Sequence, residues 1–187
     1  MPHFGVLQVD AEPTSNKTSP PTFIHGKHAM KLRSLLTSYD LNVKVTSSIM
    51  EIDAAAIRKL IWVSGMWLLC HDNHCLHDGI NVIQVHETKH TQLYELVEKE
   101  LYPASLELLQ RYHPNQISGL KDAKQIMGSV DDVMSYLESY SYSMPGAIPN
   151  KVLAIEEIDQ RNGILLSTSI DQPLHNALIE RITKIMN

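Results

Sequence analysis

Two clusters in this chain of 187 residues contain the residue types that bind metal ions. The first is HETKH, residues 86–90, which fits the H-E-x-x-H pattern. In that pattern two histidines one helical turn apart bind zinc, and the glutamate between them activates a water molecule. The second is CHDNHCLHD, residues 70–78. Its five residues of zinc-binding type are Cys70, His71, His74, Cys75 and His77. These residue types could support metal-assisted hydrolysis or bind a structural metal ion.

The context of both clusters argues against a metal site. HETKH follows DGINVIQV, a β-branched segment bounded by Gly79, and the regular helical pattern starts only near Leu93. We therefore expect HETKH to straddle a loop and the start of a helix, whereas a zinc protease needs both histidines on an established helix. The spacing in CHDNHCLHD matches no zinc-finger pattern, and a helix end followed by a polar loop explains its histidines equally well. We predict no metal ligand set and keep a small metal-binding protein as an alternative.

Composition excludes several further classes of function. The eight glycines form no G-x-G-x-x-G run, and neither a P-loop nor a G-x-S-x-G elbow is present. A net charge of −5 without a basic run predicts no nucleic-acid partner. The most apolar stretch, residues 60–70, is shorter than the roughly twenty residues that span a bilayer, so it predicts a buried helix and no membrane partner. Two cysteines and no evident leader peptide favour a cytoplasmic location.

The predicted secondary structure, which must position any site, changes near residue 53 from short strands to helices. Before it, FGVLQVDA, PTFIHG and LNVKVTSS are short β-branched runs, and KHAMKLRSLLTSY between the last two has helical spacing. Residues 1–52 are therefore predicted to form a small α/β segment. From Asp53, which the pattern favours as a helix N-cap, helical periodicity continues through residues 53–187. The predicted fold class is mainly α.

Three local signals mark individual helices in the second part. Residues 91–113 carry a leucine-rich stripe, and Pro103 is expected to kink the helix that they form. Ser129 and Asp132 have the spacing of a capping box. Pro173 stands where the first turn of a closing helix tolerates proline.

Four segments resemble the ketopantoate reductase family (2-dehydropantoate 2-reductase). EEIDQRNGILL, residues 156–166, resembles the family's helix with a T-E-I-D-x-x-N-G-like signature. IRKLIW, residues 57–62, resembles its W-x-K-L segment. YSYSMPGAIP resembles its serine-containing S-M segment, although the spacing to Glu157 is about two residues longer here. QPLH stands at the family's helix-opening proline. The resemblance covers nearly the whole chain and is weaker before residue 26.

The resemblance implies an NADP-dependent 2-oxo acid reductase. Residues 1–52 would be the end of a Rossmann domain, and residues 53–187 a helical domain of the ketopantoate reductase and 6-phosphogluconate dehydrogenase C-terminal type. By this resemblance, the helical domain would bind substrate and form dimers. Because no dinucleotide motif is present, the chain is not expected to bind NADP by itself, and a partner nucleotide-binding chain would have to supply that site. A small 2-oxo acid is the implied substrate, and a homodimer is a possible assembly.

The resemblance also implies roles for single residues. Lys59 and Glu157 would be catalytic, and Ser143 and Asn162 would bind substrate. Reducing a ketone needs a proton at the developing alkoxide while hydride arrives from the cofactor, and a lysine buried in an apolar helix has a lowered pKa suited to supply it. Lys59 and Glu157 are therefore expected to face each other across a cleft.

One departure from the family keeps other interpretations open. The family's asparagines one and two turns after the lysine are Val63 and Trp67 here, which indicates a different oxo acid. A noncatalytic helical interaction or dimerisation module is the alternative that this departure favours, and the small metal-binding protein is the third.

Overall fold

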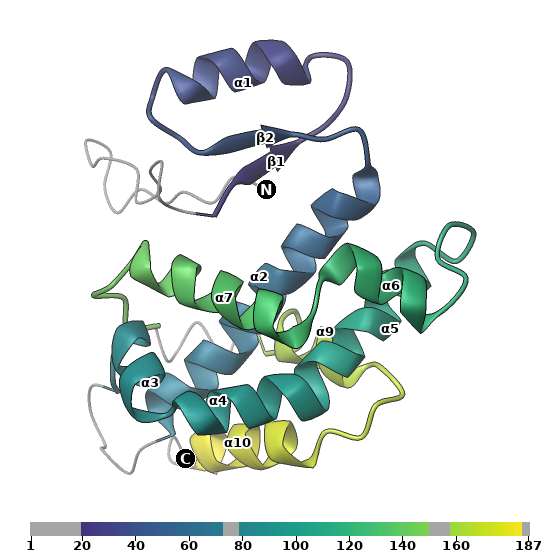
Figure 1. Ribbon diagram of the computed structural model, residues 1–187. Helices are drawn as coiled ribbons and strands as arrows, with labels where there is room; N and C mark the ends of the chain where they lie inside the picture. The colour runs from purple at the N-terminus through teal and green to yellow at the C-terminus, as the bar shows by residue number, and fades with distance from the viewer. Residues whose placement is uncertain (1–19, 73–78, 150–157, 185–187) are drawn as a thin grey trace.

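The computed structural model describes residues 20–72, 79–149 and 158–184, in which a small α/β unit sits above a helical body (Figure 1). The unit consists of β1 (Thr22–Ile24), α1 (Ala29–Thr37) and β2 (Val43–Val45). The two strands pair in parallel, with Thr22 opposite Val43. Parallel neighbours need a crossover connection, which α1 supplies. The predicted strand, helix and strand in this stretch are confirmed, and FGVLQVDA lies outside the described residues.

Helix α2 (Ile49–His71) connects the α/β unit to the body and forms the centre of the core. Its N-cap is Ser48, so the predicted start at Asp53 is wrong, and the boundary between residues 52 and 53 falls inside a continuous helix. Ile49 in the first turn is 50% exposed and residues 50–53 are only partly buried, so this turn adds little to the buried face of α2. The prediction of a buried helix at residues 60–70 is confirmed, since Ile61 and residues 64–70 are buried.

Three helical segments and one π-helical turn follow. They are α3 (Val82–Thr88), α4 (His90–Leu96), the π-helix η1 (Val97–Leu101) and α5 (Tyr102–Tyr112). The β-branched segment before HETKH is helical, so a helix begins ahead of the motif and not within it. Asn81 and Gln84 form a capping box that starts α3, and Val82 and Val85 bury its inner face at helical spacing. Local capping and burial override the β preference of these valines.

The π-helical turn lies next to Pro103, where the sequence predicts a kink. Pro103 has no N–H and cannot donate within the helix, so the backbone has to change its hydrogen-bond register nearby. Tyr102 N–H donates to the carbonyl of Val97, five residues earlier. The interruption predicted at Pro103 is therefore a widened turn just before it.

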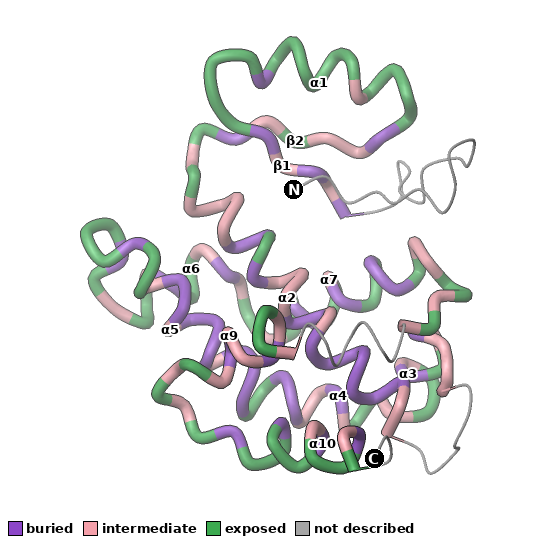
Figure 2. Tube along the Cα trace, turned by 180° about the vertical axis from the view of Figure 1, so that it is seen from behind, coloured by how far each residue is buried: buried purple, intermediate pink, exposed green. Residues whose placement is uncertain are grey.

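The body is completed by α6 (Leu120–Met127), α7 (Val130–Tyr142), α9 (Asn162–Leu166) and α10 (Pro173–Lys184). The capping box at the start of α7 and the proline in the first turn of α10 are confirmed. Figure 2 shows that buried residues follow α2 and α5 through the body, whereas α1 is largely exposed. Among the described residues no helix is both long enough and apolar enough to cross a membrane.

Candidate functional site

Lys59 lies half-buried on α2, which packs against α7. Its Nζ is 5.7 Å from the centre of the Tyr140 ring on α7, a cation–π distance. Burial lowers the pKa of Lys59, and the positive charge of Arg161, the residue before α9, lowers it further. A lysine of this kind holds its proton less tightly than a surface lysine does.

Aromatic side chains form the wall beside Lys59. Trp62, one turn along α2, packs edge to face on Tyr140 with ring centroids 4.7 Å apart. Tyr136 stacks on Tyr140 at 6.1 Å. The Tyr140 ring that faces Lys59 is thus held in place by Trp62 of α2 and Tyr136 of α7.

Arg58, the neighbour of Lys59 on α2, has a structural contact. Its guanidinium donates to the carbonyls of Ile126 and Met127 at 2.9 and 2.8 Å, and it thereby satisfies the carboxyl end of α6. Successive residues of a helix point in different directions, so this bond on one side of α2 fixes the rotation that places Lys59 on another.

The other predicted site residues are placed as follows. Glu157 lies outside the described residues, so its convergence with Lys59 remains a prediction. Ser143 follows the last residue of α7, and its hydroxyl donates to the Tyr140 carbonyl at 2.7 Å. Asn162 is the first residue of α9 and is fully buried. Asn162 directly follows Arg161, whose positive charge contributes to the lowered pKa of Lys59.

A buried polar cluster surrounds Asn162, and sequence reasoning did not find it. His175 Nε2 lies 2.7 Å from Asn162 Oδ1, and His175 Nδ1 lies 2.9 Å from Gln172 Oε1. Glu100 in η1 accepts backbone N–H bonds from Leu174 and His175, both at 2.8 Å. Burial lowers the pKa of His175 to about 4. The one feature of the sequence that could have pointed to this cluster is His175, two residues after the helix-opening Pro173.

Ser141 and His86 form a pair that resembles a nucleophile with its base. The Ser141 hydroxyl lies 3.0 Å from His86 Nε2, but it donates its one proton to the Leu137 carbonyl at 2.9 Å. It accepts from Trp62 Nε1 at 2.8 Å, so His86 must also donate to it. Ser141 is fully buried, and its lone pairs and proton are all used. The pair joins α2, α3 and α7 and does not form an activated nucleophile.

HETKH is divided between two helices. His86 lies near the end of α3, Lys89 breaks the helix, and His90 begins α4. The prediction that HETKH straddles a loop and the start of a helix is therefore wrong for its first three residues, which are already helical. Lys89 Nζ donates to the Leu69 carbonyl at 2.7 Å. Within residues 20–72, 79–149 and 158–184 no group of three or more His, Cys, Asp and Glu side chains could hold a metal ion. Positions 74, 75 and 77 lie outside these ranges.

We expect purified protein to carry no stoichiometric zinc, because the break at Lys89 separates the two histidines of HETKH. Elemental analysis after dialysis against zinc measures this directly. One tightly held metal per chain that is lost in His86→Ala and His90→Ala would revive the hydrolase interpretation.

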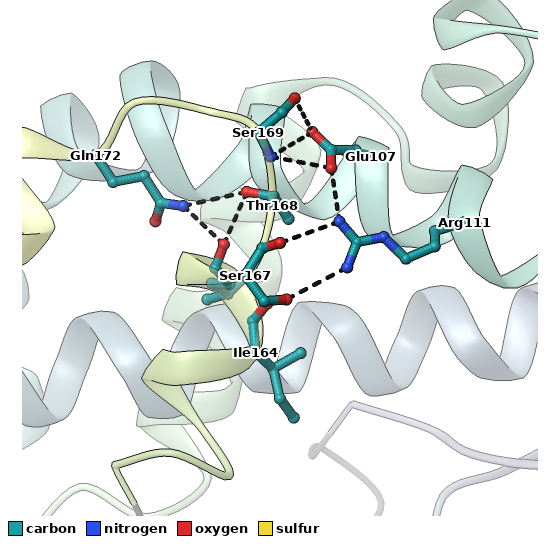
Figure 3. Close-up of polar contacts among 8 residues, drawn as sticks. Glu107, Arg111, Ile164, Ser167, Thr168, Ser169 and Gln172 are labelled. Carbon is teal, nitrogen blue, oxygen red and sulfur yellow. Dashed lines mark hydrogen bonds and ion pairs between the residues drawn. The ribbon is translucent and has the colours of Figure 1, made fainter.

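The loop between α9 and α10 is held on α5 by an ionic network (Figure 3). Glu107 accepts hydrogen bonds from the Ser169 N–H and hydroxyl, and Arg111 donates to the Ser167 carbonyl. Gln172 donates to the Leu165 carbonyl at 2.7 Å. This loop leads into α10 and therefore helps to place the cluster around Asn162.

Comparison with known proteins finds no relative of this chain. No protein-family model, no curated protein and no solved structure matches it. The residues around Lys59 and the sequence resemblance are therefore the two grounds for a function.

Proposed function

We propose that this chain is the substrate-binding helical part of an NADP-dependent 2-oxo acid reductase similar to the ketopantoate reductases. The observation that carries the proposal is the half-buried Lys59, whose pKa is lowered by burial and by Arg161. Lys59 lies in the segment that resembles the family's lysine motif. Arg161 lies in the segment that resembles its glutamate motif. The effect of the Arg161 charge on the pKa of Lys59 supports the proposal that the two segments belong to one site.

The two cations suit a 2-oxo acid. A carboxylate group would be attracted by the positive charges of Lys59 and Arg161 together. Lys59 would donate a proton to the carbonyl oxygen as negative charge develops there. Glu157 is proposed to hydrogen-bond the resulting hydroxyl. Since Asn162 is buried, we propose that it supports the site from inside and that Ser143 contacts substrate.

The described α/β unit has no pyrophosphate-binding turn for the nucleotide. The turn between β1 and α1 contains one glycine, Gly26, and α1 has no side-chain N-cap bond. A pyrophosphate needs closely spaced glycines leading into a helix. These residues do not fit NADP, so we propose that a partner nucleotide-binding domain holds it.

Binding of a 2-oxo acid tests the proposed site. We expect 2-oxobutanoate to shift the side-chain NMR signals of Lys59, because its carboxylate is attracted to Lys59 and Arg161. The affinity should fall about tenfold or more in Lys59→Ala, the size of one lost charged hydrogen bond.

Lys44→Ala is the matched control, because Lys44 also lies over an aromatic ring, 5.3 Å from the Phe23 centroid, but on the α/β unit. Its affinity should equal that of the unchanged protein, and butanamide, which lacks the carboxylate, should not bind. Equal binding by Lys59→Ala and the unchanged protein would refute the site.

A second candidate is an interaction or dimerisation module, and the exposed apolar residues of the α/β unit favour it. Met30, Leu35 and Tyr39 are 63%, 55% and 69% exposed along and just after α1. Apolar side chains grouped on one element are typical of surfaces that contact a partner. Failure of every oxo acid to bind would make this the better function.

A further inference from the structure

A groove of about 570 Å³ runs along α5, between α6 and the loop that leads into α10. Helix α6 packs against α5 and forms one of its walls (Figure 1). This volume lies within the range of small-molecule sites, which are lined mainly by apolar side chains. The apolar lining here consists of Tyr102, Pro103, Leu106, Leu120, Val130 and Ile170.

The hydrogen-bonding groups along the groove are already used inside the protein. The Ser169 N–H and hydroxyl donate to the Glu107 carboxylate at 2.9 and 2.6 Å, and Arg111 donates to it at 2.8 Å (Figure 3). The Tyr102 hydroxyl donates to the Gly128 carbonyl at 2.6 Å. A bound peptide would bring N–H and carbonyl groups that find few partners on these walls. An alkyl chain has no such groups and needs no partners.

One end of the groove carries free positive charge. Lys124 lines the groove and also a neighbouring hollow of about 680 Å³, which Lys121 lines as well. Within residues 20–72, 79–149 and 158–184 no carboxylate forms an ion pair with either ammonium group. The Ser129 hydroxyl in this hollow donates to Asp132 at 2.7 Å. The two lysines are therefore available to an anion where the apolar groove meets the hollow.

The length of the groove and its charge balance define the ligand further. From Tyr102 to Gln110, α5 rises by about 12 Å, the length of an extended alkyl chain of about ten carbons. Leu120 and Lys124 are one turn apart on α6, so an apolar contact and a cation share one face of that helix. Glu98 also lines the groove and repels an anion, but two lysines oppose this one charge.

We propose that this groove binds a free single-chain fatty carboxylate. Its alkyl chain would lie on the apolar residues of α5 and α6, and its carboxylate would contact Lys121 and Lys124. The proposal does not rest on the reductase function, because none of the residues around Lys59 lines the groove.

Binding of decanoate to the whole chain, below the concentration at which micelles form, is the test, and calorimetry measures it. We expect one saturable site per chain. Leu120→Ser should weaken binding about tenfold, because an apolar contact with the alkyl chain is lost. Leu120 is 57% exposed, so the melting temperature should stay unchanged. Leu35→Ser is the matched control, since Leu35 is 55% exposed on α1, and its affinity should equal that of the unchanged protein.

The charged end is tested with the double variant Lys121→Ala and Lys124→Ala. Decanoate should bind to it about tenfold more weakly, the size of two surface charge contacts. Decanol, which lacks the charge, should bind equally to the double variant and to the unchanged protein. Glu98→Gln should strengthen decanoate binding by about threefold, because it removes a repelling charge. Lys184→Ala, which removes an exposed lysine from α10, is the control without effect.

An unchanged decanoate affinity in Leu120→Ser or in the double lysine variant would overturn the proposal. Weaker decanoate binding in Glu98→Gln would also overturn it, because Glu98 would then hold a cationic group of the ligand. Binding to phosphatidylglycerol vesicles without binding of free decanoate would replace the fatty carboxylate with a lipid surface. Lys59→Ala should bind decanoate normally whether or not it has lost the oxo acid, so the two sites fail or succeed separately.

Discussion

Replacing Lys59 with alanine is expected to lower turnover by about a hundredfold or more in a reductase assembled from this chain and a nucleotide-binding domain. The reason is the loss of the proton donor to the developing alkoxide. Folding should change little, because Lys59 is only half-buried and its Nζ lies over the Tyr140 ring at 5.7 Å. Steady-state kinetics with a saturating nucleotide measures the effect.

Lys59→Arg separates the two roles of the residue. Arginine keeps the positive charge for the substrate carboxylate but does not release a proton near neutral pH. KM should therefore stay close to that of the unchanged enzyme while kcat falls. Lys44→Ala serves again as the control with unchanged turnover. Near-normal kcat in both Lys59 variants would show that another group supplies the proton.

Lowering the pH from 7 to 4 is expected to remove about 3 kcal/mol of stability through His175 alone. Burial lowers its pKa from 6.5 to about 4 in the folded protein. Below pH 6.5 the unfolded chain takes up a proton that the folded chain does not, so protonation favours unfolding. The contribution is complete above pH 6.5, is lost as the pH falls through the window to about 4, and is constant below it.

Urea unfolding at pH 7 and pH 5 measures this dependence. Between these pH values the unchanged protein should lose about 2 kcal/mol more than His175→Gln, which has no titrating ring at this position. Other histidines titrate in both proteins and cancel in the difference. Equal losses in the two proteins would mean that the pKa of His175 is the same in the folded and unfolded protein, and a smaller loss in the unchanged protein would mean that the folded state holds the protonated ring.

Several helices and strands could be predicted from signals confined to a few neighbouring residues. The capping box of Ser129 and Asp132, the proline that opens α10 and the β-branched runs of β1 and β2 act within one turn or one strand. Short-range preferences of this kind do not depend on the rest of the fold, so the sequence predicts them. The start of α2 was missed because its first turn buries little.

The helix at Val82–Thr88 shows where local preference misleads. Its valines favour a strand, yet Val82 and Val85 are fully buried against the body and Asn81 caps the helix. The energy of burying apolar side chains exceeds the small difference in propensity. The division of HETKH at Lys89 follows from the packing of α3 and α4 and has no signal in the motif itself.

The sequence by itself determined a mainly helical chain with a small parallel α/β unit, and it pointed to Lys59 through a resemblance. The tertiary structure alone decided that Lys59 lies over the Tyr140 ring, and that His175 joins Asn162 inside the body. These partners are far apart along the chain. Their pairing depends on how α2, α7, α9 and α10 pack, and the lowered pKa values depend on the burial that this packing creates.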